Sequence, residues 1–194
     1  MSDFILIIFS AALVNNIVVE QIIGADPALA FMRKMDVATG MSCTMIILLP
    51  LVTVCAYAID TFLLIPLGLQ YLNLLVFVSV ILLLAWCLKL WAHRINQKLA
   101  GRIIIFLPLA GINTTVLGTL LLNQQLAHGM FTSLAFGLGV GLGFSLILLM
   151  LTAINERLEV ADVPAPFRGM SITLITLALI SMAFLGFTGL INVK

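Results

Sequence analysis

Long runs of apolar residues dominate the chain. Six apolar segments can be drawn, at about residues 4–31, 38–59, 71–91, 102–122, 129–153 and 169–191. Most are about 18 residues or longer, the length that a helix needs to cross the hydrocarbon core of a bilayer. They lack the alternation of apolar and polar residues that barrel strands show. Because a helix satisfies its own backbone hydrogen bonds in lipid, the pattern predicts an all-α integral membrane protein with six transmembrane helices.

Composition agrees with this prediction. The chain of 194 residues is 63% hydrophobic and 9% charged, with a mean hydropathy of +1.27. A soluble domain of this size carries about 25% charged residues. The net charge of +1 gives no indication of nucleic-acid binding. Asp3 stands where a signal peptide would carry basic residues, so the first segment is interpreted as a span. We therefore expect a single membrane domain over 1–194, with the lipid bilayer as its surroundings.

The basic residues predict the orientation of the spans. With six spans, the loops between segments one and two, three and four, and five and six lie on one side. These loops and their flanks contain Arg33, Lys34, Lys89, Arg94, Lys98, Arg102, Arg157 and Arg168, and the other side contains only Lys194. Basic residues favour the cytoplasmic side. Both termini, the loop near 60–70 with Asp60 and Pro66, and the loop near 123–128 are therefore expected to be periplasmic.

The first and fourth segments are interrupted by polar, glycine and proline residues. The first contains Asn15, Asn16, Glu20, Gln21, Gly24, Asp26 and Pro27, and the fourth contains Pro108, Gly111, Asn113, Thr114, Thr115 and Gly118. Such breaks are tolerated at membrane depth only where protein or a water-filled cavity surrounds them. Each interrupted segment opens a set of three spans, as in transporters built from inverted repeats. The sequence thus predicts a first repeat at about 1–95 and a second at about 96–194.

The polar residues of these breaks are the candidates for a central site or ion path: Asn15, Asn16, Glu20, Asp26, Asn113 and Thr114. An ionisable group inside a span is a functional hypothesis by default, here a cation path or a proton relay. The alternatives are structural. Asp26 can cap a half-helix that has Pro27 at its first position, and Glu20 can pair with another subunit. Asn113 and Thr114 can satisfy backbone groups that the break sets free.

The remaining polar and small residues indicate packing and connection, and no catalytic residue is assigned. Four glycines two residues apart form two overlapping GxxxG pairs that allow close helix approach: Gly137, Gly139, Gly141 and Gly143. The three cysteines lie in apolar stretches without metal-ligand spacing, which favours buried free thiols and no metal site: Cys43, Cys55 and Cys87. Residues 156–168, which contain two prolines, are either a connecting loop or a docking surface for a partner subunit.

Several short motifs carry a resemblance to a known family. They are Leu13-Val14-Asn15-Asn16, Ile59-Asp60-Thr61 with Ile65-Pro66-Leu67, Ile105-Phe106-Leu107-Pro108-Leu109 with Val116-Leu117-Gly118, Glu156-Arg157-Leu158 with Ala161-Asp162-Val163-Pro164-Ala165-Pro166-Phe167-Arg168-Gly169, and Phe184-Leu185-Gly186-Phe187 with Gly189-Leu190. Over its whole length the chain resembles the family of the A-type subunits of Rnf (Rsx) electron transport complexes. It is less closely similar to the E-type subunit of the sodium-pumping NADH:quinone reductase.

The resemblance implies six helices in two inverted halves and a complex in the bacterial inner membrane that couples electron transfer to ion translocation. It also implies partners: a homologous sister membrane subunit of the E type, and subunits that carry flavin and iron–sulfur groups. The family holds a [2Fe-2S] cluster between two of its own cysteines and two of the sister subunit. This chain has Gly24-Ala25-Asp26-Pro27 for the family's Gly-x-Cys-Pro and Asn113-Thr114 for its Asn-Cys. Since such clusters need thiolate or imidazole ligands, we predict that this chain contributes no cofactor ligand.

These considerations lead to one function and two alternatives. The expected function is that of a membrane subunit of an Rnf-type ion-translocating oxidoreductase, not catalytic by itself. The first alternative is a redox-inactive paralogue that acts as a small transporter or ion pore. The second is a structural scaffold that holds a sister subunit in place.

Overall fold

The computed structural model describes residues 2–20, 34–95, 97–126 and 129–187, and every regular element in these ranges is a helix. The α-helices are α1 (Ser2–Phe9), α2 (Ile17–Glu20), α4 (Met35–Ile59), α5 (Ile65–Leu67), α6 (Asn73–Ile95), α7 (Gln97–Ile112), α8 (Thr114–Leu126), α9 (Met130–Val160) and α10 (Met170–Leu185). The π-helical turns are η1 (Ser10–Val14) and η2 (Asp60–Leu64), and the 3-10 turns are η3 (Gln70–Leu72) and η4 (Ala165–Phe167).

Several of these helices are long and apolar enough to cross a membrane. In the described ranges they are Met35–Leu67 (33 residues), Gln70–Trp91 (22 residues) and Met130–Val160 (31 residues). A fourth candidate is the pair Ile105–Ile112 and Thr114–Leu126, which is bent by 53°. Apolar helices of fewer than 18 residues cover Phe4–Val19 and Met170–Leu185. These stretches follow the order of the six predicted segments, but the first and last are too short to count as spans by the same measure.

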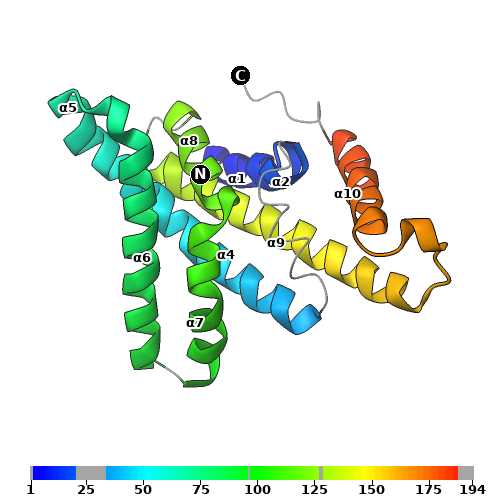
Figure 1. Cartoon of the computed structure of the whole chain (residues 1–194). Helices are drawn as coiled ribbons and strands as arrows, with labels where there is room; N and C mark the ends of the chain where they lie inside the picture. The colour runs from blue at the N-terminus through cyan, green and yellow to red at the C-terminus, as the bar shows by residue number, and fades with distance from the viewer. Residues whose placement is uncertain (1, 21–33, 96, 127–128, 188–194) are drawn as a thin grey trace.

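The antiparallel helices α4 and α9 form the centre of the structure, as Figure 1 shows. A Cβ atom at Gly137 of α9 would lie 2.7 Å from the Cα of Pro50, and one at Gly141 would lie 3.2 Å from the Cα of Ile46. Residue numbers therefore rise along α9 as they fall along α4. The core between the two helices contains large side chains that are fully buried, among them Met45, Leu48, Leu49, Ile147 and Leu148.

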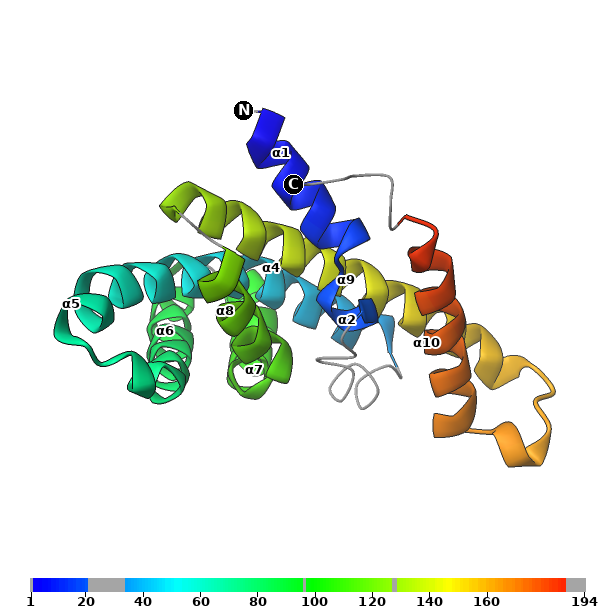
Figure 2. The ribbon, with the colours of Figure 1, turned by 90° about the horizontal axis from the view of Figure 1, so that it is seen from above.

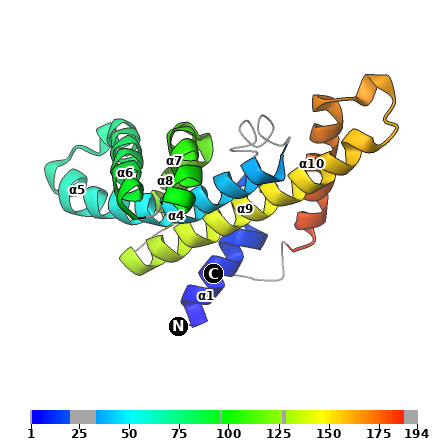
Figure 3. The ribbon, with the colours of Figure 1, turned by 90° about the horizontal axis from the view of Figure 1, so that it is seen from below.

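The other helices lie on opposite sides of this central pair. Helices α7 and α8 pack against α4, and α6 packs against α7. On the far side, α1 and η1 pack against α9, while α10 contacts both α9 and α2. Figures 2 and 3 show this order, with α6, α7 and α8 on one side of the pair and α1 on the other. The first interrupted segment therefore packs against α9, and the second packs against α4.

The outward surface is apolar. Along α6, side chains that are about half exposed or more include Leu74, Leu75, Leu82, Leu83, Trp86, Leu90 and Trp91. A soluble monomer rarely exposes a contiguous apolar patch of more than a few hundred Å². In a bilayer the same side chains face lipid tails at no cost. The surface of α6 thus agrees with the membrane environment that the composition predicts.

The helix that begins at Met35 is longer than predicted. The apolar segment 38–59 was expected to end in a loop near 60–70, but the helix continues through η2 and α5. Pro66 lies in α5, directly after the π-helical turn η2. The turn comes at Gly68, whose φ of +66° favours glycine. The predicted loop was therefore wrong for Asp60 and Pro66, which are both helical.

Candidate functional site: two helix breaks capped by asparagine

The first interrupted segment is broken at Asn15 and Asn16. The π-helical turn η1 ends at Val14, and the N–H of Asn15 donates to the carbonyl of Ser10 at 2.7 Å. Asn15 has a non-helical backbone (φ −108°, ψ 54°) and an exposed side chain. π-Helical turns inside α-helices occur frequently at functional sites. The helix axis thus stops here, and α2 begins at Ile17.

Asn16 joins the two sides of this break. Its side chain is only 2% exposed, and its Oδ1 accepts the N–H of Val18 at 3.0 Å. Its carbonyl accepts the N–H of Val19 at 3.1 Å, while its Nδ2 donates to the carbonyl of Ala12 at 2.8 Å. One side chain therefore caps the start of α2 and also satisfies a carbonyl of the preceding turn. Both polar atoms of this buried amide have a partner.

Asn113 makes the same cap at the second break. Its side chain is 4% exposed, its Oδ1 accepts the N–H of Thr115 at 2.9 Å, and its carbonyl accepts the N–H of Val116 at 3.1 Å. Pro108 and Gly111 were expected to contribute to this break, but α7 continues through both of them to Ile112. The asparagine is decisive because its amide replaces the helical hydrogen bond that the bend removes.

The two caps differ in whether the amide nitrogen of the asparagine is hydrogen-bonded. The Nδ2 of Asn113 is buried and, among the described residues, has no hydrogen-bond partner. The Nδ2 of Asn16 donates to Ala12 instead. A buried donor without a partner costs about 1–3 kcal/mol. Such a group in a native structure commonly marks a bound water or ion.

The other predicted site residues are Asn15, described above, and Thr114, Glu20 and Asp26. Thr114 is exposed. The side-chain hydrogen bonds of Asn16 and Asn113 described above join each asparagine to residues of its own interrupted segment. Glu20 is the last residue of α2, and its side chain lies outside the described part. Asp26 lies in the range 21–33, which is also outside the described residues. What the structure does bring together is α2 and α8, the helices that follow the two breaks.

Two of the four predicted packing glycines face the first break. A Cβ atom at Gly139 would lie 2.7 Å from the Cβ of Ala11 and 2.8 Å from the carbonyl oxygen of Ile8. A Cβ atom at Gly143 would lie 2.7 Å from the Nδ2 of Asn16. Any side chain at either glycine would therefore push the interrupted segment away from α9.

The other two glycines, Gly137 and Gly141, face α4. A Cβ atom at Gly137 would collide with the Oγ1 of Thr53, and one at Gly141 would lie 3.3 Å from the carbonyl oxygen of Met45. The four glycines thus form two rows on α9, one toward the central partner helix and one toward the first break. Such rows let helix backbones approach closely in a membrane.

Of the buried polar residues of α8, only Thr115 was singled out from the sequence. Asn123 was wrongly assigned to the loop near 123–128, since it lies within α8. Thr115, Thr119 and Asn123 are almost completely buried, and the Nδ2 of Asn123 donates to the Oγ of Ser133 at 3.2 Å. The signal was present, because residues four apart share one face of a helix. For Thr119 and Asn123 this signal was hidden by the apolar residues that surround them.

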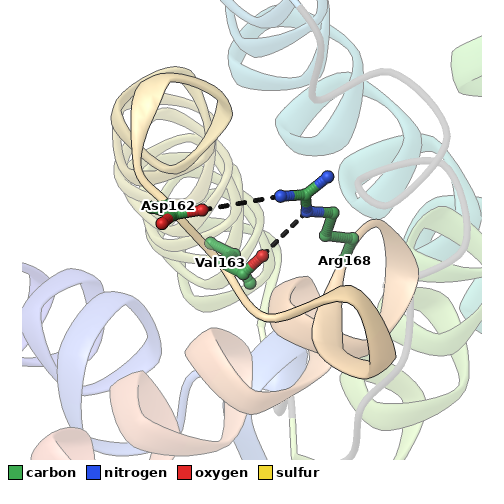
Figure 4. Close-up of polar contacts among 3 residues, drawn as sticks. All are labelled: Asp162, Val163 and Arg168. Atoms are coloured by element: carbon green, nitrogen blue, oxygen red, sulfur yellow. Dashed lines mark hydrogen bonds and ion pairs between the residues drawn. The ribbon is translucent and has the colours of Figure 1, made fainter.

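The connection between α9 and α10 is held by local contacts. The Nε of Arg168 donates to the carbonyl of Val163 at 2.7 Å, and its guanidinium lies 3.6 Å from the carboxylate of Asp162 (Figure 4). Both charged side chains are exposed, so the ion pair adds little stability. At the start of this connection, Glu156 accepts the N–H of Met35 at 3.0 Å, which links the ends of α9 and α4.

The second break lacks a thiol at the position that follows its asparagine. No group of three or more His, Cys, Asp or Glu side chains in the described ranges could hold a metal ion. At the second break the side chain after Asn113 is the neutral hydroxyl of Thr114, which is a poor iron ligand. Cys43 and Cys55 lie on α4 and Cys87 lies on α6, so none of the thiols belongs to either break.

Comparison with known proteins gives a full-length match. The model of the Rnf-Nqr family, described as "Rnf-Nqr subunit, membrane protein", matches residues 4–191. The chain is 42% identical over 193 residues to the A-type subunit of the ion-translocating oxidoreductase complex of Colwellia psychrerythraea, covering 100% of both chains. It is 43% identical over 192 residues to the protein of the same name from Thioalkalivibrio sulfidiphilus, covering 99% of this chain and 100% of that one. The corresponding protein of Actinobacillus pleuropneumoniae is 42% identical over 193 residues, covering 100% of both.

Proposed function

The chain belongs to the Rnf-Nqr family of membrane proteins, and we propose that it is the A-type membrane subunit of an ion-translocating oxidoreductase complex. The observation that carries this proposal is the identity of about 42% over the full chain with proteins of that name. The apolar outward surface of α6 and the long apolar helices support a place within the bilayer. The chain acts as one part of a larger assembly and not as an enzyme by itself.

The proposed architecture is six spans in two inverted repeats, about 1–95 and about 96–194. Two observations support it. Each half begins with a segment that is broken at a buried asparagine, and the caps of Asn16 and Asn113 have the same geometry. In addition, the first interrupted segment packs against α9 of the second half, while α7 and α8 pack against α4 of the first half. A two-fold axis in the membrane plane produces such an exchange of partners.

The proposed location is the bacterial inner membrane with both termini periplasmic. The basic residues of the sequence support this orientation, because the exposed side chains of Lys34, Arg157 and Arg168 all belong to loops on one side in the six-span arrangement. The proposed partners are subunits that carry flavin and iron–sulfur groups, together with a homologous sister membrane subunit of the E type. The flavin and iron–sulfur subunits would supply the electrons, and this chain would form part of the membrane path for the ion.

We further propose that this chain provides no ligand to a [2Fe-2S] cluster. Aspartate and threonine stand at the two positions where the resemblance implies cysteine, and the buried amide of Asn113 caps α8. The test is to replace Cys43, Cys55 and Cys87 together by serine in the complete complex. Iron content and the EPR spectrum are expected to match those of the unmodified complex. A loss of a [2Fe-2S] signal would show that one of these thiols is a ligand after all.

Purification of the tagged chain from bacterial membranes tests the function. In a mild detergent, the chain is expected to retain flavin-containing and iron–sulfur subunits, which mass spectrometry identifies. Membrane vesicles from a strain without the chain are expected to lose ion uptake coupled to electron transfer, and a plasmid copy is expected to restore it. A chain that purifies free of redox subunits would contradict the proposal.

A second candidate function is a redox-inactive transporter, ion pore or scaffold. The observation in its favour is that neither cluster position has a thiol, while the second break keeps its cap. The discriminating experiment places the purified chain alone in liposomes. Ion flux without any partner protein would favour the transporter or pore. An inert chain that is needed for assembly of its partners would favour the scaffold.

A further inference from the structure

Helix α8 carries a buried polar face that begins at the second break. Thr115, Thr119 and Asn123 are spaced four residues apart and are 0%, 0% and 2% exposed. Side chains at this spacing lie above one another on one side of a helix. Since α8 packs against α4 and α9, the polar face is enclosed by other helices of the chain. Asn113, which caps α8, extends it by one more buried polar residue.

The two ends of this polar face carry polar atoms without partners. Among the described residues, no group accepts from the Nδ2 of Asn113 and no group donates to the Oδ1 of Asn123. One end thus offers a free donor and the other a free acceptor. Between them, the hydroxyl of Thr119 donates to the carbonyl of Thr115 at 2.6 Å and keeps its capacity to accept.

The described residues that follow the first break differ from those of α8. After Asn16, the helix α2 continues with Ile17, Val18 and Val19, which are apolar. Both polar atoms of the Asn16 amide are also hydrogen-bonded. The free amide nitrogen of Asn113 is therefore not a necessary consequence of an asparagine cap.

The length of the face matches part of a membrane crossing. Asn113 and Asn123 are ten residues apart, which corresponds to about 15 Å along a helix at about 1.5 Å per residue. This is about half of the hydrocarbon core of a bilayer, which is about 30 Å thick. The face therefore leads from the break to the end of α8 at Leu126.

We propose that the polar face of α8 is one half of the path of the translocated cation, lined by ordered water. Water accepts from the Nδ2 of Asn113 and donates to the Oδ1 of Asn123, so it satisfies both free atoms. The hydroxyl of Thr119 between them is a further acceptor. This proposal rests on the proposed function, because a cation crosses the membrane only if the complex translocates ions. Ordered water can conduct a proton or hydrate a Na⁺ ion, so the polar face suits either ion.

The main test compares Thr119→Val with Thr152→Val in the complete complex. Both threonines are 0% exposed, and both hydroxyls donate to the carbonyl four residues earlier, Thr152 at 2.8 Å. Thr152 lies on α9, outside the polar face, so it is a matched control. In proteoliposomes, Thr119→Val is expected to lower the number of ions moved per electron by about fivefold, as the loss of one hydrogen bond of about 1 kcal/mol predicts. The control is expected to keep the original ratio.

Two ion assays run in parallel identify the ion. One assay measures uptake of ²²Na⁺, and lower uptake in Thr119→Val assigns the path to Na⁺. The other measures acidification with a pH-sensitive dye, and less acidification in Thr119→Val assigns the path to protons. Equal ratios for the two variants in both assays would overturn the proposal. Electron transfer is measured in the same samples, so that loss of the whole complex is recognised.

A labelling experiment tests hydration without relying on activity. In a chain whose three cysteines are replaced by serine, Thr119→Cys is compared with Thr152→Cys in native membranes. A small thiol reagent that reacts in water is expected to modify the thiol at position 119 at least about tenfold faster, because thiolate forms only where water reaches it. Equal, slow labelling of both positions would overturn the proposal. Failure of the proposed function would instead appear as a chain that purifies without redox subunits, whatever the labelling shows.

Discussion

Replacement of Gly143 by alanine tests how closely α9 approaches the first helix break. The added methyl group would lie 2.7 Å from the Nδ2 of Asn16, 2.8 Å from the carbonyl oxygen of Ala12 and 3.0 Å from its Cα. Two of these atoms are backbone atoms, so no side-chain rotation relieves the contact. The nitrogen is also fixed by its hydrogen bond to Ala12. The interrupted segment must therefore move away from α9.

The expected loss of stability follows from two opposing effects. One extra methyl group in a packed interior costs about 1–3 kcal/mol. Alanine regains about 1 kcal/mol over glycine within a helix. The net loss is therefore about 0–2 kcal/mol. A change of this size lowers the Tm of a chain of about 150–250 residues by up to about 8 °C.

The measurement is thermal unfolding of the purified chain in detergent, with Gly111→Ala as the matched control. Gly111 lies within α7, and a methyl group there would lie 3.5 Å from the Cβ of Ala85, an ordinary contact. This variant gains helix propensity without a clash, so its Tm is expected to rise by about 2–4 °C. If Gly143→Ala were stabilised to the same degree, the close approach of α9 to Asn16 would be refuted.

Two further predictions concern the helix ends. Asn16→Ala removes two side-chain hydrogen bonds and Asn113→Ala removes one, so Asn16→Ala is expected to be less stable by about 1 kcal/mol in the same unfolding assay. Equal Tm values would contradict the difference between the two amides. Glu156→Ala removes the acceptor of the Met35 N–H and is expected to cost about 0.5–1 kcal/mol, as for other helix caps. Glu156→Gln, which keeps an oxygen acceptor, is expected to retain most of the Tm, and an equal loss in both variants would contradict this assignment.

The paired asparagine caps also bear on the proposal that this chain provides no cluster ligand. The Oδ1 of Asn113 accepts the N–H of Thr115, and the Oδ1 of Asn16 accepts the N–H of Val18. Both breaks are thus stabilised by amide groups of the chain itself. Neither of these two cap hydrogen bonds uses a residue at position 26 or 114.

The sequence by itself determined the class of the protein and the position of its unusual segments. Hydropathy depends on composition along a short stretch of chain, so the long apolar helices could be read from the sequence alone. The breaks in segments one and four could be predicted in the same way, because the polar residues that mark them are a feature of local composition. Local composition did not decide where a helix ends. Asp60 and Pro66 were wrongly assigned to a loop, because the helix that begins at Met35 continues through both residues and turns only at Gly68.

Only the tertiary structure decided what the polar residues do. Asn16 and Asn113 look alike in sequence and make the same cap, yet one amide nitrogen is bonded and the other, among the described residues, is free. Whether a donor has a partner depends on atoms brought in from elsewhere in the fold. In the same way, the threonines of α8 became a polar face only when α4 and α9 enclosed them. Burial and hydrogen bonding are properties of the assembled helices, whereas membrane character is a property of the chain.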